Sequence, residues 1–115
     1  MSYRYEHVML NRVIDGDTCV LTIDCGFNFH RRKQTDGVSY RLARINAPEL
    51  SQSGGPEAKF ALAQYFFVPV RVETLRDPDK YGRFLIEIEA FIGDNWINVN
   101  DAMVAAGFAA YKSYA

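Results

Sequence analysis

The stretch YRLARINAPE, residues 40–49, decides how the rest of the chain is interpreted. It begins with side chains that suit a half-buried β-strand. Pro48 has no backbone N–H and favours an extended residue before it, so we expect the strand to end near Asn46. The stretch therefore places one arginine, Arg41, inside a strand and one carboxylate, Glu49, on the loop that follows it.

Two other polar segments are candidates to meet this loop. DGDT, residues 15–18, precedes the stretch, and DKYGR, residues 79–83, follows it. Asp15 and Asp17 are two positions apart, so their carboxylates point the same way if the backbone between them is extended. We expect the three segments to converge on one site that binds a metal ion and a phosphate group.

The residue types in these segments suit that chemistry. Carboxylates of Asp15, Asp17 and Glu49 on loop edges are hard oxygen ligands, which suit calcium and, less strictly, magnesium. The guanidinium groups of Arg41 and Arg83 can grip a phosphate with two parallel hydrogen bonds and stay charged. The alternatives are that Asp-Gly-Asp only makes a turn and that each arginine forms a structural ion pair with one of the aspartates.

Composition indicates one globular domain over residues 1–115. Hydrophobic residues make up 49% and aromatic residues 14%, which is enough for a sizeable core. The net charge of −1 does not indicate a polyanionic partner, but residues 30–44 hold an excess of +4, five basic side chains against Asp36. The five are Arg31, Arg32, Lys33, Arg41 and Arg44. A solvated basic loop is the alternative for the first three.

Neither a disulfide nor a membrane segment is expected. Cys19 and Cys25 lie in one predicted strand, about 20 Å apart when it is extended, whereas a disulfide needs Cα atoms within about 7 Å. The first residues lack the apolar core of a signal peptide, and no apolar run is long enough to span a bilayer. We therefore expect synthesis in the cytoplasm and no membrane association.

Residue patterns predict about five strands and two helices, and Asp36-Gly37 reads as a turn before the third strand. The predicted strands are residues 5–14, 18–25, 38–46, 70–75 and 84–91, the last with a short return strand from Trp96. One helix begins at Pro56-Glu57 and ends before Val68. The second covers residues 101–106, capped by Asn98 or Asn100 and stopped by Gly107. A small closed barrel accommodates this order, although an open α+β sheet would too.

Five motifs occur in a fixed order and together resemble the staphylococcal nuclease (thermonuclease) family. They are IDGDT at residues 14–18, YRL through APE at residues 40–49, GPEA at residues 55–58, DKYGR at residues 79–83 and AMVAAGFA at residues 102–109. The resemblance covers about residues 13–109. It implies a five-stranded OB-fold barrel with helices, mainly β, with one helix inserted and one near the C-terminus. It also implies a calcium-dependent phosphodiesterase that hydrolyses DNA and RNA.

The resemblance assigns roles by position. The metal ligands would be Asp17 directly, Asp15 through the outer sphere, Asn46 and the Ala47 carbonyl. Glu49 would orient or deprotonate the attacking water, and Arg41 and Arg83 would hold the phosphate. Water would displace the 5′-oxygen and leave 3′-phosphate ends. Further substrate contacts are expected from Arg31, Arg32, Lys33, Tyr81 and Tyr111.

Two departures from the family pattern bear on these roles. Asn46 stands where the family often has an aspartate, which removes one negative charge and leaves calcium against magnesium open. The loop from Glu49 to Pro56 is short and lacks the lysines common in the family, while the connection over residues 27–39 is long. The expected protein is a monomeric nuclease for single-stranded or frayed DNA and RNA. The alternative is a non-catalytic OB-fold module that binds nucleic acid or protein.

Overall fold

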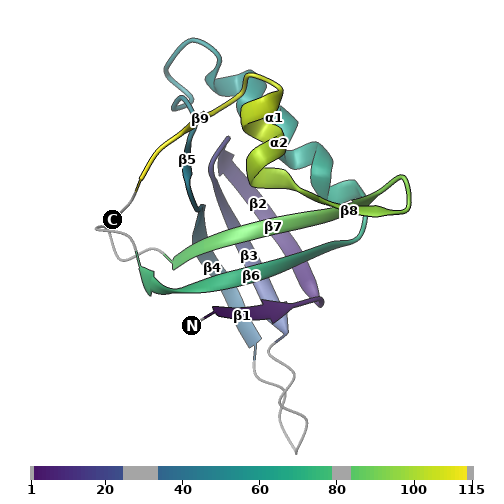
Figure 1. The fold of residues 1–115 in the computed structure, drawn as a ribbon. Helices are drawn as coiled ribbons and strands as arrows, with labels where there is room; N and C mark the ends of the chain where they lie inside the picture. Colours follow the sequence, from purple (N-terminus) through teal and green to yellow (C-terminus); the bar gives the residue numbers. More distant parts are fainter. Residues whose placement is uncertain (1, 25–33, 79–83, 114–115) are drawn as a thin grey trace, which may run out of the picture.

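The computed structural model describes residues 2–24, 34–78 and 84–113 (Figure 1). Its strands are β1 (Ser2–Tyr5), β2 (Val8–Asp15), β3 (Thr18–Asp24), β4 (Gln34–Leu42), β5 (Ile45–Asn46), β6 (Val70–Pro78), β7 (Phe84–Ile92), β8 (Asn95–Asn98) and β9 (Ala110–Tyr111). Its helices are α1 (Gly55–Gln64), the 3₁₀ turn η1 (Tyr65–Phe67) and α2 (Val99–Ala105). The fold is mainly β with two α-helices, as the sequence predicts.

One curled sheet carries the architecture. Its strand order is β1-β6-β7-β4-β3-β2, with β8 added to β7, while β5 and β9 form a separate two-stranded pair. Figure 1 shows β6 and β7 crossing β2, β3 and β4, with both helices together at one end. The five long strands, β2, β3, β4, β6 and β7, correspond to the five that were predicted, and the others are short additions. This curled sheet agrees with the predicted OB-type fold.

The predicted strand over residues 38–46 is wrong in its continuity. The chain leaves β4 after Leu42 and returns to strand only at Ile45, because Arg44 adopts the left-handed conformation with φ of 67°. The sequence offers no glycine to signal this break. The Ala43 N–H donates to the Ile86 carbonyl at 2.8 Å, so contacts with β7 hold the bend in place.

Two smaller boundaries also differ from the predictions. Residues 5–14 split into β1 and β2, and β1 pairs with β6. Gly37 lies inside β4, not in a turn before it, with φ of 61° at a register shift between β3 and β4. A glycine at positive φ in a strand is typical of a bulge, which bends the strand without ending it.

The core lies between the sheet and the two helices. Helix α1 contributes Ala58 and Leu62, and α2 contributes Val99 and Met103, all fully buried. The predicted first helix is confirmed, with Pro56 in its first turn. The second begins earlier than predicted, because Asn98 is the N-cap and its side chain accepts from the Asp101 N–H at 2.8 Å.

Asn100 is buried and ties three elements together. Its side-chain NH₂ donates to the carbonyls of Ala43 and Ile86 at 2.9 and 3.0 Å, and its Oδ1 accepts from the Ile88 N–H at 3.1 Å. A buried polar side chain is tolerated only when its hydrogen bonds are made, and here they are. Asn100 therefore joins α2 to β7 and to the bend after β4.

Cys19 is buried and forms no disulfide within the described part of the chain. Burial raises the pKa of its thiol to about 12, so it packs as an unreactive apolar group. Cys25 lies outside the described residues. Among the described helices, none is long and apolar enough to cross a membrane.

We predict that Asn100→Ala lowers the free energy of unfolding by about 3 kcal/mol, because buried backbone groups at Ala43, Ile86 and Ile88 lose a partner. Urea denaturation measures this. The matched control is Asn95→Ala at the exposed start of β8, where the side chain donates to the Gly93 carbonyl, and a change within about 0.5 kcal/mol is expected. Equal losses in the two variants would contradict the role of Asn100.

Candidate active site

The turn between β2 and β3 brings Asp15 and Asp17 into the candidate site. Asp15 ends β2 and Thr18 begins β3, so Gly16 and Asp17 form a tight turn. The Asp17 N–H donates to Asp15 Oδ1 at 3.1 Å. The backbone is therefore turned and not extended here, and the Asp15 carboxylate binds the main chain of Asp17.

Gly16 allows this turn to pack closely on its neighbours. A Cβ atom at Gly16 would lie 2.6 Å from the Ala58 Cβ and 2.9 Å from the Ala47 Cβ, both closer than real Cβ contacts. The β2–β3 turn thus rests directly on α1 and on the residue that follows β5. Any larger side chain would push the turn away from the loop that carries Ala47.

The Asp17 carboxylate is the most deeply buried charge of the site, in a residue that is only 2% exposed. Oδ1 accepts from the Thr18 hydroxyl at 2.9 Å. Oδ2 accepts from the Ala47 N–H at 2.8 Å and from Arg41 Nη2 at 3.1 Å. Three protein donors thus satisfy a buried carboxylate, which would otherwise be costly to desolvate.

Arg41 faces Asp17 because of strand register. Thr18 and Arg41 are cross-strand partners, and the Leu42 N–H donates to the Asp17 carbonyl at 2.8 Å. Arg41 Nη2 also donates to Asn46 Oδ1 at 2.9 Å. One cationic nitrogen therefore joins both side chains that the sequence predicts as direct metal ligands. The ion pair between an arginine and an aspartate, left open by the sequence, is present.

The Asp15 carboxyl group has a raised pKa of about 6. Partial burial is the largest cause, followed by the hydrogen bond with the Asp17 side chain and by the negative charge of that side chain, and all three disfavour the ionised form. The hydrogen bond from the Asp17 N–H acts the other way and lowers the pKa. Two neighbouring carboxyl groups in a half-buried site attract a proton or a cation. The predicted outer-sphere role of Asp15 stays a prediction.

Glu49 lies on a compact turn after Pro48. Its N–H donates to Gln52 Oε1 at 2.8 Å, and its carbonyl accepts from the Gln52 N–H at 2.9 Å. A Cβ atom at Gly55 would collide with the Glu49 carbonyl. These contacts fix the Glu49 backbone, while its exposed carboxylate makes no hydrogen bond or ion pair with any residue that the structure describes.

Tyr111 is engaged by a second polar cluster. Its hydroxyl donates to Asp101 Oδ1 at 2.8 Å, and Arg44 lies 5.9 Å from the ring centroid. Arg44 donates to both Glu87 oxygens at 2.7 Å and to Asp101 at 2.8 Å. Hydrogen bonds from Arg44 and Tyr111 lower the pKa of Asp101. β9 pairs with β5, so this cluster adjoins the strand that carries Asn46.

Five of the predicted site residues lie outside the part of the chain that the structure describes: Arg31, Arg32, Lys33, Tyr81 and Arg83. The excess of +4 over residues 30–44 also overstates the positive charge that the segment presents, because carboxylates partly neutralise two of its five basic side chains. Arg41 pairs with Asp17, and Arg44 pairs with Glu87 and Asp101. The predicted phosphate contacts of Arg41 and Arg83 stay predictions.

Some contacts that build the site were not predicted from the sequence. Thr18 and the Ala47 N–H both bind Asp17, and Gln52 holds the Glu49 backbone. Thr18 had a signal, since it belongs to the DGDT motif. The ion pair of Arg44 had no local sequence signal, because its partner Glu87 lies 43 residues away in the sequence.

The donor set fits a hard cation. Within the described ranges, no three side chains of His, Cys, Asp or Glu group closely enough to hold a metal ion by themselves. Asp17 and Asn46 nevertheless converge on one cationic nitrogen of Arg41, which marks a position where a positive charge meets two oxygen ligands. Carboxylate, amide and carbonyl oxygens are the ligands that calcium and magnesium take.

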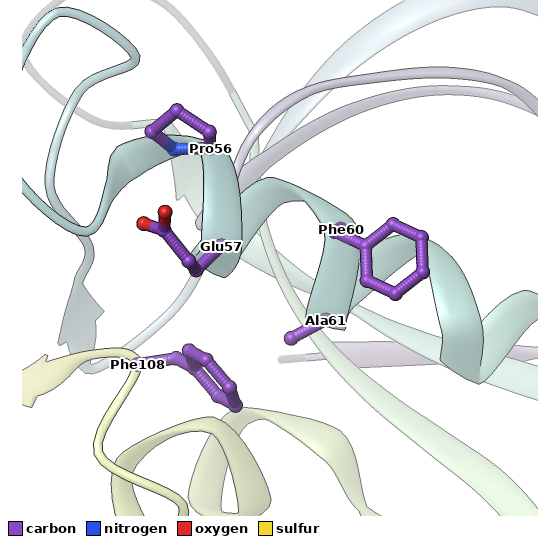
Figure 2. Close-up of a pocket in the computed structure, with 5 residues that line it drawn as sticks. All are labelled: Pro56, Glu57, Phe60, Ala61 and Phe108. Atoms are coloured by element: carbon purple, nitrogen blue, oxygen red, sulfur yellow. The ribbon is translucent and has the colours of Figure 1, made fainter.

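An apolar hollow lies on another part of the surface, against α1. Its volume is about 410 Å³, and Figure 2 shows its lining residues of α1, which are Pro56, Glu57, Phe60 and Ala61, along one side and Phe108 on the other. Phe60 is 67% exposed. The described residues that line the hollow are mostly apolar and include no arginine, so this lining suits an apolar contact and not a phosphate group.

A comparison with models of known protein families identifies the family of this chain. The model of the family described as staphylococcal nuclease homologue matches residues 39–115. The chain therefore belongs to the staphylococcal nuclease family, and the resemblance noted in the sequence is confirmed.

Three relatives cover most of this chain. Protein ParB of Escherichia coli is 36% identical over 114 residues, 88% of this chain and 55% of ParB. Micrococcal nuclease of Shigella flexneri is 34% identical, covering 90% of this chain and 57% of that protein. Thermonuclease of Staphylococcus intermedius is 32% identical, covering 96% and 62%. The chain thus spans little more than half the length of these relatives.

We predict that ionisation of Asp15 reduces stability as the pH rises. Its folded pKa of about 6 lies above the ordinary 3.8, so the protonated carboxyl group favours the fold. That contribution is fully present below about pH 4 and is lost as the pH passes 6. Urea denaturation in buffer with a chelator, compared with Asp15→Asn, measures it. The wild type should lose stability relative to Asp15→Asn between pH 4 and 7, and parallel curves would contradict the prediction.

Proposed function

We propose that this chain is a metal-dependent phosphodiesterase that hydrolyses DNA and RNA, with calcium as the first candidate for its metal. The observation that carries the proposal is the convergence of Asp17, Arg41 and Asn46 beside the fixed turn of Glu49. Family membership and two relatives named as nucleases support the same activity.

Asp17, Asn46 and the Ala47 carbonyl would hold the ion, with Asp15 behind them. When bound, the ion would offset negative charge on the phosphate. Arg41 would donate hydrogen bonds to the same phosphate, and Arg83 is proposed to act with it. Both guanidinium groups would stabilise the extra charge that develops on phosphorus in the transition state.

Glu49 is proposed to orient the attacking water and to accept its proton. Its backbone is held by Gln52, and its carboxylate is exposed and not neutralised by any described residue. A carboxylate at this place would contribute through general base catalysis and through orientation of the water. In-line attack would release the 5′-oxygen and leave a 3′-phosphate end.

Single-stranded or frayed DNA and RNA are the proposed substrates, and the acting unit is proposed to be a monomer. The proposed phosphate contacts read the backbone and carry no base sequence, so cleavage should show little sequence preference.

A non-catalytic module that binds protein is the second candidate. Two observations favour it: Asn46 supplies no charge to a metal, and the apolar hollow beside α1 offers a binding surface. The two candidates differ in turnover, since a module would bind without cleaving any phosphodiester.

We predict that Glu49→Gln and Arg83→Ala each lower the rate of cleavage of denatured DNA by at least about a hundredfold. The assay compares calcium, magnesium, manganese and a chelator, and it identifies the product ends. The matched control is Glu57→Gln, an exposed glutamate of α1 that lines the hollow and not the site, with a change of less than about twofold expected.

Cleavage that stops with chelator and yields 3′-phosphate ends supports the proposed reaction. Failure of the wild type to cleave with any divalent ion would overturn it and leave the binding module as the better candidate.

A further inference from the structure

Arg41 occupies a position that the proposed metal ion also requires. Its Nη2 atom lies 3.1 Å from Asp17 Oδ2 and 2.9 Å from Asn46 Oδ1. These two oxygens are the side-chain ligands proposed for the divalent ion. We propose that the Arg41 guanidinium and the divalent ion compete for Asp17 and Asn46, an inference that rests on the proposed metal site.

Electrostatics makes the two cations exclude each other. The side chain of Asp17 is 2% exposed and that of Arg41 is 12% exposed, so solvent screens the charges weakly. A divalent ion coordinates oxygen at about 2.3–2.6 Å, which would put it against the guanidinium nitrogen. Like charges at that distance repel strongly where water is excluded.

Only the Arg41 contact is replaceable. The Ala47 N–H, which also binds the Asp17 carboxylate, belongs to the backbone, and the Thr18 hydroxyl is carried by a buried, β-branched side chain with few rotamers. Arg41 reaches Asp17 through a long side chain that has other rotamers available. The ion therefore gains its ligands by displacing the guanidinium and not by breaking the other two bonds.

The charges of the three side chains already balance. Asp17 contributes one negative charge, Arg41 one positive charge, and Asn46 none. An aspartate in place of Asn46 would leave a net negative charge that calls for a further cation, whereas the amide does not. The Asp15 carboxyl group beside Asp17 adds negative charge where it ionises, so the guanidinium offsets part of the charge of the site, and a metal ion competes with it for Asp17 and Asn46.

The inference predicts that removing the guanidinium improves metal binding. Calcium is titrated by calorimetry into the full chain without nucleic acid, using wild type, Arg41→Met and Arg71→Met. Arg41→Met should bind calcium at least about tenfold more tightly than wild type. Arg71→Met removes the same charge from β6, where Arg71 pairs with Glu89, and should change the affinity by less than about twofold.

Arg41→Lys provides a variant that keeps the charge. Its affinity for calcium should lie closer to wild type than to Arg41→Met, and circular dichroism establishes that each variant is folded. In the wild type, added calcium should shift the side-chain Nε–Hε NMR signal of Arg41 while leaving that of Arg44 in place, which tests displacement without any substitution.

Three results would overturn the inference: unchanged or weaker binding in Arg41→Met, an equal gain in Arg71→Met, or no calcium binding by any of the proteins. None of them depends on cleavage. A chain that cleaves DNA and yet gives one of these results refutes the competition alone, whereas a chain that binds calcium as predicted without cleaving refutes the proposed nuclease alone.

Discussion

The buried carboxylate of Asp17 is the interaction on which the site depends. It receives hydrogen bonds from the strand that follows it, from Arg41 on β4 and from the Ala47 main chain beyond β5. Leaving a carboxylate this deep without partners would cost several kcal/mol, so each segment is held where its donor is needed. The turn, the strand end and the loop thus form one unit before any ligand is considered.

The same unit explains why the neighbouring glycines matter for function. Gly16 lets the turn lie against Ala47 and Ala58, and Gly55 leaves room for the Glu49 carbonyl. Both residues act through the absence of a side chain. A second polar cluster, built on Arg44, holds β5 and β9 from the other side by joining Glu87 and Asp101. The loop with Asn46 and Glu49 is therefore fixed from two directions.

Local signals predicted much of this fold from the sequence. Proline and glutamate marked the start of α1, alternation marked β3 and β7, and the order of motifs indicated the family. The break at Arg44 and the hydrogen bonds of Asn100 were not predictable, because they depend on partners 43 and 57 residues away in the chain. The motif that holds Asp17 indicated a site, but no local pattern distinguishes a metal ligand from the partner of an arginine.

A double-mutant cycle between Asp17 and Arg41 tests the central claim most directly. Asp17→Asn, Arg41→Met and the double variant are unfolded with urea in the presence of a chelator. A buried, hydrogen-bonded pair should give a coupling energy of about 1–3 kcal/mol, against less than about 1 kcal/mol for the more exposed pair Arg71–Glu89. Additive losses at Asp17 and Arg41, within about 0.3 kcal/mol, would contradict the account.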